Sequence, residues 1–108
     1  MNGQVLLDAC VPRWLRKHLS NAEVETAHFA GLDHLSDSAS LDAMEGRFDV
    51  LVTLDRNLTY QQKIEARSIS VTVLRMADQT PEAFGALTPA LNNAIAEAKV
   101  GKVKLLGP

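Results

Sequence analysis

Two aspartates each follow directly on a run of apolar residues. Residues 5–7 precede Asp8, and residues 50–54 precede Asp55. Short continuous apolar runs are typical of strands buried on both faces of a parallel sheet, and parallel strands joined by right-handed crossovers end along one edge. The two carboxylates would then be neighbours, and a hard cation such as Mg²⁺ or Mn²⁺ would relieve their repulsion. The pattern predicts a divalent-metal site at Asp8 and Asp55.

Three further polar residues are placed to support such a site. Asp37 lies at the start of a predicted helix between the two strands and is a candidate third acid. Thr53 and Asn57 flank Asp55 at two-residue spacing, where they can hydrogen-bond a carboxylate or a metal-bound water. Each residue also has an ordinary alternative, because aspartates at strand ends, threonine and asparagine commonly cap helices or shape turns.

Basic side chains follow the two key strands in the sequence and are candidates for phosphate contacts beside the acidic edge. They are Arg13, Arg16, Lys17, Arg56, Lys63 and Arg67. The alternative is that they form ordinary solvated helix faces.

Other chemistries lack the residues they need. The histidines, His18, His28 and His34, have no zinc-site spacing to one another or to Cys10. There is no Gly-x-Ser-x-Gly motif and no glycine-rich phosphate loop, so acyl transfer and nucleotide-driven reactions are not expected.

Composition indicates one globular domain covering residues 1–108. The chain is 46% apolar and 22% charged, with neither repeat nor linker, and its formal charge of −2 argues against a polybasic nucleic-acid binder. Cys10 is the single cysteine, which excludes an intrachain disulfide, and we expect it to be buried. With no apolar run long enough to cross a bilayer, we expect a cytoplasmic protein without membrane contact.

Strand and helix patterns alternate along the chain. We expect strands over residues 4–8, 23–28, 48–54, 69–74 and 102–106. We expect helices over residues 12–19, 36–46 and 59–66, and then either two helices or one helix kinked at Pro89 after Thr80. This alternation predicts a three-layer α/β/α fold with a mostly parallel sheet of four to five strands.

Residues 5–12 and 45–58 resemble the two signature segments of the short PIN-like domain family of bacteria, and residues 67–75 also fit. The resemblance implies a PIN-like fold and a Mg²⁺- or Mn²⁺-dependent ribonuclease. Its catalytic acids would be Asp8 and Asp55, with Asp37 matched less securely. Of the basic residues after the two strands, Arg13, Arg16 and Arg56 are the candidate RNA contacts. Many members are toxins that act beside a small antitoxin, and related domains suggest a homodimer.

The sequence departs from the family pattern in ways that leave other functions open. Ala9 and Ala39 stand where relatives can carry polar or acidic residues, and Asn57 or Leu58 replaces a fourth acid. One alternative is therefore a PIN-like binding module without chemistry. The other is a receiver domain phosphorylated on Asp55, although a receiver has adjacent acids after its first strand.

Overall fold

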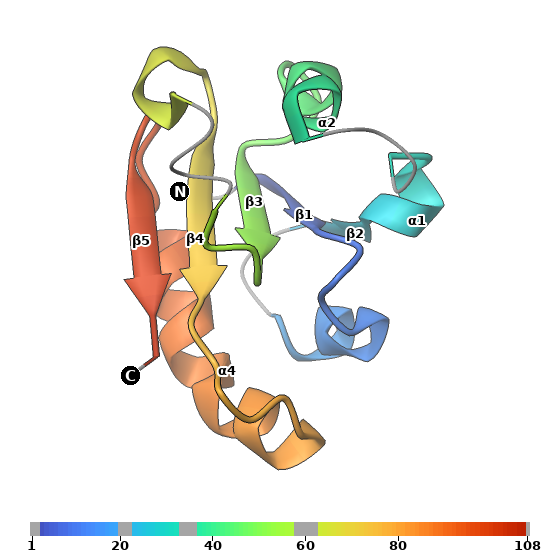
Figure 1. The fold of residues 1–108 in the computed structure, drawn as a ribbon, viewed down its shortest axis with the longest axis vertical. Coiled ribbons are helices and arrows are strands. Elements are labelled where there is room, and N and C mark those ends of the chain that lie inside the picture. Colours follow the sequence, from blue (N-terminus) through green and yellow to red (C-terminus); the bar gives the residue numbers. More distant parts are fainter. Residues whose placement is uncertain (1–2, 20–22, 33–36, 58–62, 108) are drawn as a thin grey trace.

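The chain forms a five-stranded sheet in which every strand runs in the same direction (Figure 1). The computed structural model describes residues 3–19, 23–32, 37–57 and 63–107, and the side chains of residues 37 and 38 lie outside this description. The strands are β1 (Gln4–Leu7), β2 (Glu23–Thr26), β3 (Val50–Thr53), β4 (Ser70–Leu74) and β5 (Val103–Leu106). Their order in space is β2-β1-β3-β4-β5, which confirms the predicted parallel sheet.

Helices cover both faces of the sheet, so the predicted three-layer α/β/α architecture is also confirmed. One face carries the 3₁₀ helix η1 (Arg13–His18) and α4 (Pro81–Ala96), and the other carries α1 (Ala27–Ala30), α2 (Asp37–Met44) and the 3₁₀ helix η2 (Ile64–Ala66).

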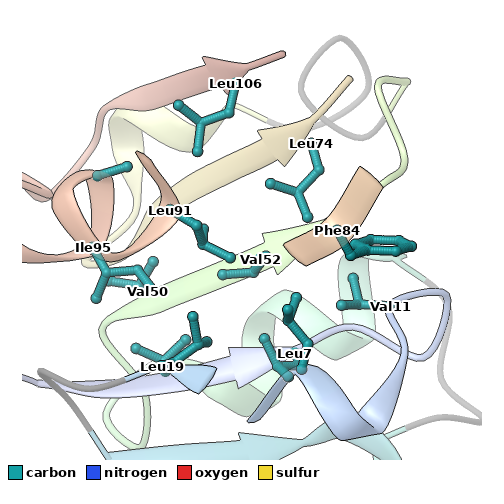
Figure 2. Packing of buried hydrophobic residues seen from close by; sticks show 13 residues of the cluster. Leu7, Val11, Leu19, Val50, Val52, Leu74, Phe84, Leu91, Ile95 and Leu106 are labelled. Carbon is teal, nitrogen blue, oxygen red and sulfur yellow. The ribbon is translucent and has the colours of Figure 1, made fainter. Parts of the chain in front are cut away.

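The alternation of side chains along each strand divides the core between these two faces. Leu7 and Val52 belong to the α4 side, whereas Leu6 and Leu51 belong to the α2 side. Figure 2 shows the first cluster, in which Phe84 and other apolar residues of α4 lie against the strands. Because both faces are covered, the central strands read as continuous apolar runs in the sequence.

The segment after β1 is helical but tighter than expected. An α-helix was predicted from Pro12, and the structure has the 3₁₀ helix η1, which begins after Pro12 and ends where Leu19 returns to extended backbone. Leu15 and Leu19 are buried, while Trp14 stays 38% exposed. Short 3₁₀ helices are common in connections, and the buried Leu15 and Leu19 hold this one against the sheet.

Other predicted boundaries shift by a few residues. The strand predicted over residues 23–28 ends at Thr26, because the Thr26 hydroxyl accepts a hydrogen bond from the Phe29 N–H and begins α1. The predicted helix over 59–66 is represented by η2 alone, since residues 58–62 lie outside the description. Gly46, at φ 84°, provides the predicted stop after α2.

A single helix, α4, runs through Pro89, which agrees with the one-helix alternative of the prediction and excludes the alternative with two helices. Thr80 caps it as expected, accepting a hydrogen bond from the Ala83 N–H at 3.2 Å. Thr88 does not cap a second helix, because its hydroxyl donates to the Phe84 carbonyl at 3.0 Å. Buried residues before and after Pro89, such as Phe84 and Leu91, hold both halves of α4 against the sheet.

Within the described residues, no helix combines the length and the apolar character that crossing a membrane requires.

Candidate functional site

The carboxyl ends of β1 and β3 are adjacent in the centre of the sheet. The chain moves from β1 outward to β2 and then returns past β1 to β3, which makes the β1/β3 junction the topological switch point where α/β sheets form their binding crevice. Leu7 is in register with Val52, and the Asp8 N–H extends the ladder by donating to the Val52 carbonyl at 2.9 Å. Asp8 and Asp55 therefore lie at the same edge of the sheet.

The Thr53 hydroxyl connects the two aspartates. Thr53 is fully buried, and its Oγ1 donates to Oδ2 of Asp8 at 2.7 Å while accepting the N–H of Asp55 at 3.0 Å. The contact follows from the register, because one step beyond Leu7 and Val52 places Asp8 opposite Thr53 on the same face of the sheet. A single buried hydroxyl thus orients one carboxylate directly and positions the backbone of the other.

Both carboxylates retain acceptor capacity. Oδ1 of Asp8 accepts the Ala9 N–H at 2.8 Å, and Oδ1 of Asp55 accepts the Asn57 N–H at 2.9 Å. An ionised carboxylate offers about four acceptor positions, so these bonds leave room on each for a cation or for the waters around it. Asn57 contributes through its backbone N–H, which forms the predicted turn after Asp55.

The donor set suits a hard cation, because the carboxylate oxygens of Asp8 and Asp55 are the ligand type that Mg²⁺ and Mn²⁺ prefer. Asp37 begins α2, but its side chain lies outside the described part of the structure. Among residues 3–19, 23–32, 37–57 and 63–107, no three His, Cys, Asp or Glu side chains form a group that could hold a metal ion. The described part of the site therefore offers two acids, and retained waters would complete the coordination.

Cys10 belongs to this cluster, although it was expected to be a buried hydrophobic residue. It is exposed as a residue, and its Sγ lies 3.7 Å from both Oδ2 of Asp8 and Oγ1 of Thr53. The Leu54 N–H donates to this sulfur at 3.5 Å. Partial burial of the sulfur raises the pKa of the Cys10 thiol, and the nearby Asp8 charge raises it further. The thiol is thus held in its neutral form beside Asp8.

Arg13, Arg16 and Arg56 are all exposed. Arg13 and Arg16 belong to η1, which follows β1, and Arg56 lies in the turn after Asp55. A hollow of about 460 Å³ opens beside Asp8 and is lined by residues 8–13 and 26–28. Arg13 therefore shares a hollow with Asp8.

Arg67 and Lys63 do not flank the acidic edge, which corrects the sequence-based hypothesis. Both precede β4 and so lie near its amino end, opposite the end that carries Asp55. Nη1 of Arg67 lies 2.8 Å from Oδ1 of Asp42 and 3.1 Å from Oε2 of Glu45. The Ser68 N–H and Arg67 together lower the pKa of Glu45. Arg67 thus serves a structural ion-pair cluster.

Sequence reasoning did not place Cys10, Trp14, His28 or Phe29 at the site, although all four line the hollows beside it. Cys10 was visible as a polar neighbour two positions after Asp8. His28 and Phe29 approach the site only because β2 pairs with β1, with Leu7 in register with Thr26. No local pattern in the sequence marks that approach.

We expect Thr53→Val to destabilise the protein by about 1–3 kcal/mol, because it leaves Oδ2 of Asp8 and the Asp55 N–H without their hydroxyl partner. Thr53→Ser keeps the hydroxyl and is the matched control. Urea denaturation followed by circular dichroism measures the free energy of unfolding of all three proteins. An unchanged free energy of unfolding in Thr53→Val would contradict the role given to the Thr53 hydroxyl.

Comparison of the chain with protein-family models, with curated proteins and with solved structures finds no match.

Proposed function

We propose that this chain is a Mg²⁺- or Mn²⁺-dependent ribonuclease of the PIN-like type. One observation supports it above the others: Asp8 and Asp55 share the β1/β3 edge and are connected through the buried Thr53 hydroxyl. Holding two carboxylates in a fixed arrangement at a switch point is what a cation site requires. The resemblance of residues 5–12 and 45–58 to PIN-like segments points to the same chemistry.

In this proposal Asp8 and Asp55 hold the cation, and Thr53 fixes the orientation of Asp8. The bound ion supplies an activated water and offsets the charge that develops on the phosphodiester. Arg13 lines the hollow beside Asp8 and would position a phosphate there, and Arg56 would do so beside Asp55. The chain's own contribution is positioning and charge.

The test is cleavage of a labelled single-stranded RNA by the purified protein with and without metal. We expect cleavage in Mn²⁺, no cleavage after EDTA, and recovery when excess Mn²⁺ is restored. Cleavage that continues unchanged in EDTA would contradict a metal-dependent mechanism. An absence of cleavage together with an absence of calorimetric Mn²⁺ binding would contradict the proposal as a whole.

A second candidate is a PIN-like binding module without chemistry. It is favoured by Ala9 beside Asp8 and by the two-acid character of the described part of the site. Mn²⁺ or RNA binding without cleavage across several RNA sequences would support this candidate.

The strand order β2-β1-β3-β4-β5 also occurs in flavodoxin-like folds, which include receiver domains. Incubation with acetyl phosphate separates this reading from the nuclease. A phosphoryl mass added on Asp55 would favour a receiver, and an unchanged mass would favour the nuclease. From the same family resemblance we also propose that RNA is the substrate, that the chain forms a homodimer, and that a small antitoxin protein is its partner.

A further inference from the structure

A second hollow, of about 340 Å³, lies between η1 and α1. It is lined by Arg13, Trp14, Arg16, Lys17, Thr26, His28 and Phe29. Three of these residues, Arg13, Thr26 and His28, also line the hollow beside Asp8. The two hollows therefore adjoin each other, and we call them together the η1–α1 groove, which reaches Asp8 at the β1/β3 edge.

The η1–α1 groove is positively charged although the chain as a whole carries a formal charge of −2. Its outer part is lined by Arg13, Arg16 and Lys17 and by no acidic residue. Within the described residues, none of these three cations forms an ion pair. Glu23 and Glu25 line a different hollow, which they share with Arg16. The outer part of the groove thus gathers three basic side chains that form no ion pair within the described residues.

Two aromatic rings are exposed in the same groove. Phe29 is 76% exposed and Trp14 is 38% exposed. The Trp14 ring is held edge-on against the buried Phe84 at 6.1 Å between centroids and against His18 at 5.6 Å. Exposing a phenylalanine ring leaves apolar area in water, and aromatic rings beside cations are the platform on which unpaired bases stack.

We propose that single-stranded RNA reaches the candidate metal site through the η1–α1 groove. Its bases stack on Phe29 and Trp14, and its phosphates contact Arg13, Arg16 and Lys17. This inference rests on the proposed nuclease function and adds the surface on which single-stranded RNA would bind. A duplex keeps its bases paired and stacked on one another, so it has no free base face to offer the two rings. An acidic peptide would complement the cations but not the rings.

The chain contains one tryptophan, so fluorescence reports directly on the groove. The test is a titration of the protein in EDTA with an oligouridine of about 12 nucleotides. This length falls within the site size of small domains that bind single strands. We expect quenching of Trp14, and we expect Phe29→Ala to weaken binding by about 5- to 100-fold. Phe29→Tyr retains the ring and should bind within about twofold of the unchanged protein. Phe29 is so exposed that neither substitution should unfold the chain.

The phosphate contacts are tested by Arg13→Ala and Arg16→Ala. Each should weaken binding and reduce its dependence on salt concentration, because fewer counterions are released. Lys99→Ala is the matched control, since Lys99 lies between α4 and β5, near the amino end of β5, and also removes one exposed positive charge. It should bind RNA like the unchanged protein.

Three results would contradict the proposed RNA-binding groove. They are unchanged RNA affinity in Phe29→Ala, equal affinity for a duplex of the same length, and displacement of the labelled RNA by polyglutamate as effective as displacement by unlabelled RNA. The experiment separates this inference from the nuclease proposal because it contains no metal. RNA binding that depends on Phe29 without any cleavage in Mn²⁺ would support the groove and contradict the nuclease. Cleavage that is unaffected by Phe29→Ala would support the nuclease and contradict the groove.

Discussion

Asp8→Asn and Asp55→Asn are each expected to lower Mn²⁺-dependent RNA cleavage by at least about 100-fold. Changing a residue that only supports a metal ligand already costs up to about 100-fold, so changing a ligand itself should cost at least as much. The amide keeps the size of the carboxylate and one oxygen acceptor but removes the negative charge that attracts the cation. Both aspartates are expected to matter because they lie at one edge of the sheet and are connected through Thr53. Single-turnover cleavage rates at fixed Mn²⁺ measure the effect.

Asp49→Asn is the matched control for these variants. Asp49 directly precedes β3 and so lies at the amino end of the strand, where its Oδ2 accepts the Gln4 N–H at 2.9 Å. The substitution changes charge in the same way but at the opposite end of the sheet, so cleavage should be nearly unchanged. Melting temperatures establish that all three variants are folded. Wild-type rates in folded Asp8→Asn and Asp55→Asn would end the assignment of these residues as catalytic.

Phe84→Ala is expected to reduce the free energy of unfolding by about 3–5 kcal/mol, a large part of the roughly 5–15 kcal/mol that stabilises a domain of this size. Phe84 is only 2% exposed and packs between α4 and the sheet in the cluster of Figure 2. Its ring also supports the edge of Trp14. The lost ring leaves a cavity at this junction, and urea denaturation measures the cost.

Phe84→Leu separates packing volume from aromatic contact. It retains most of the apolar volume, so its loss of stability should be smaller than that of Phe84→Ala. Both variants should change the emission of Trp14 in the folded state, because both remove its T-shaped contact with the Phe84 ring. A loss below about 1 kcal/mol for Phe84→Ala would show that the core relaxes to fill the site and that Phe84 does not anchor α4.

The strands that carry the candidate site were predictable from the sequence because their signals are local. Continuous apolar runs marked β1 and β3, since strands covered by helices on both faces need no polar alternation. The alternation of helix and strand then implied the parallel sheet, and the shared edge of Asp8 and Asp55 followed from it. Thr80 and Gly46 also act locally, as a cap and a stop, so their roles were readable as well.

Contacts between segments distant in the sequence had to come from the tertiary structure. The register of β1 with β3 decides that the Thr53 hydroxyl donates to Asp8. Arg67 forms ion pairs with Asp42 and Glu45, so it does not make the phosphate contacts predicted for it. Likewise, residues before and after Pro89 in α4 are buried against the sheet, so the helix continues through a residue that often ends helices.

The sequence alone determined the order of the strands and the positions of the two strand-end acids, because apolar periodicity and caps depend on neighbouring residues. Only the tertiary structure decided which side chains surround those acids, from the thiol of Cys10 to the rings of Trp14 and Phe29. Those neighbours depend on strand order, register and helix packing, which are set by the free energy of the whole core and not by any one segment.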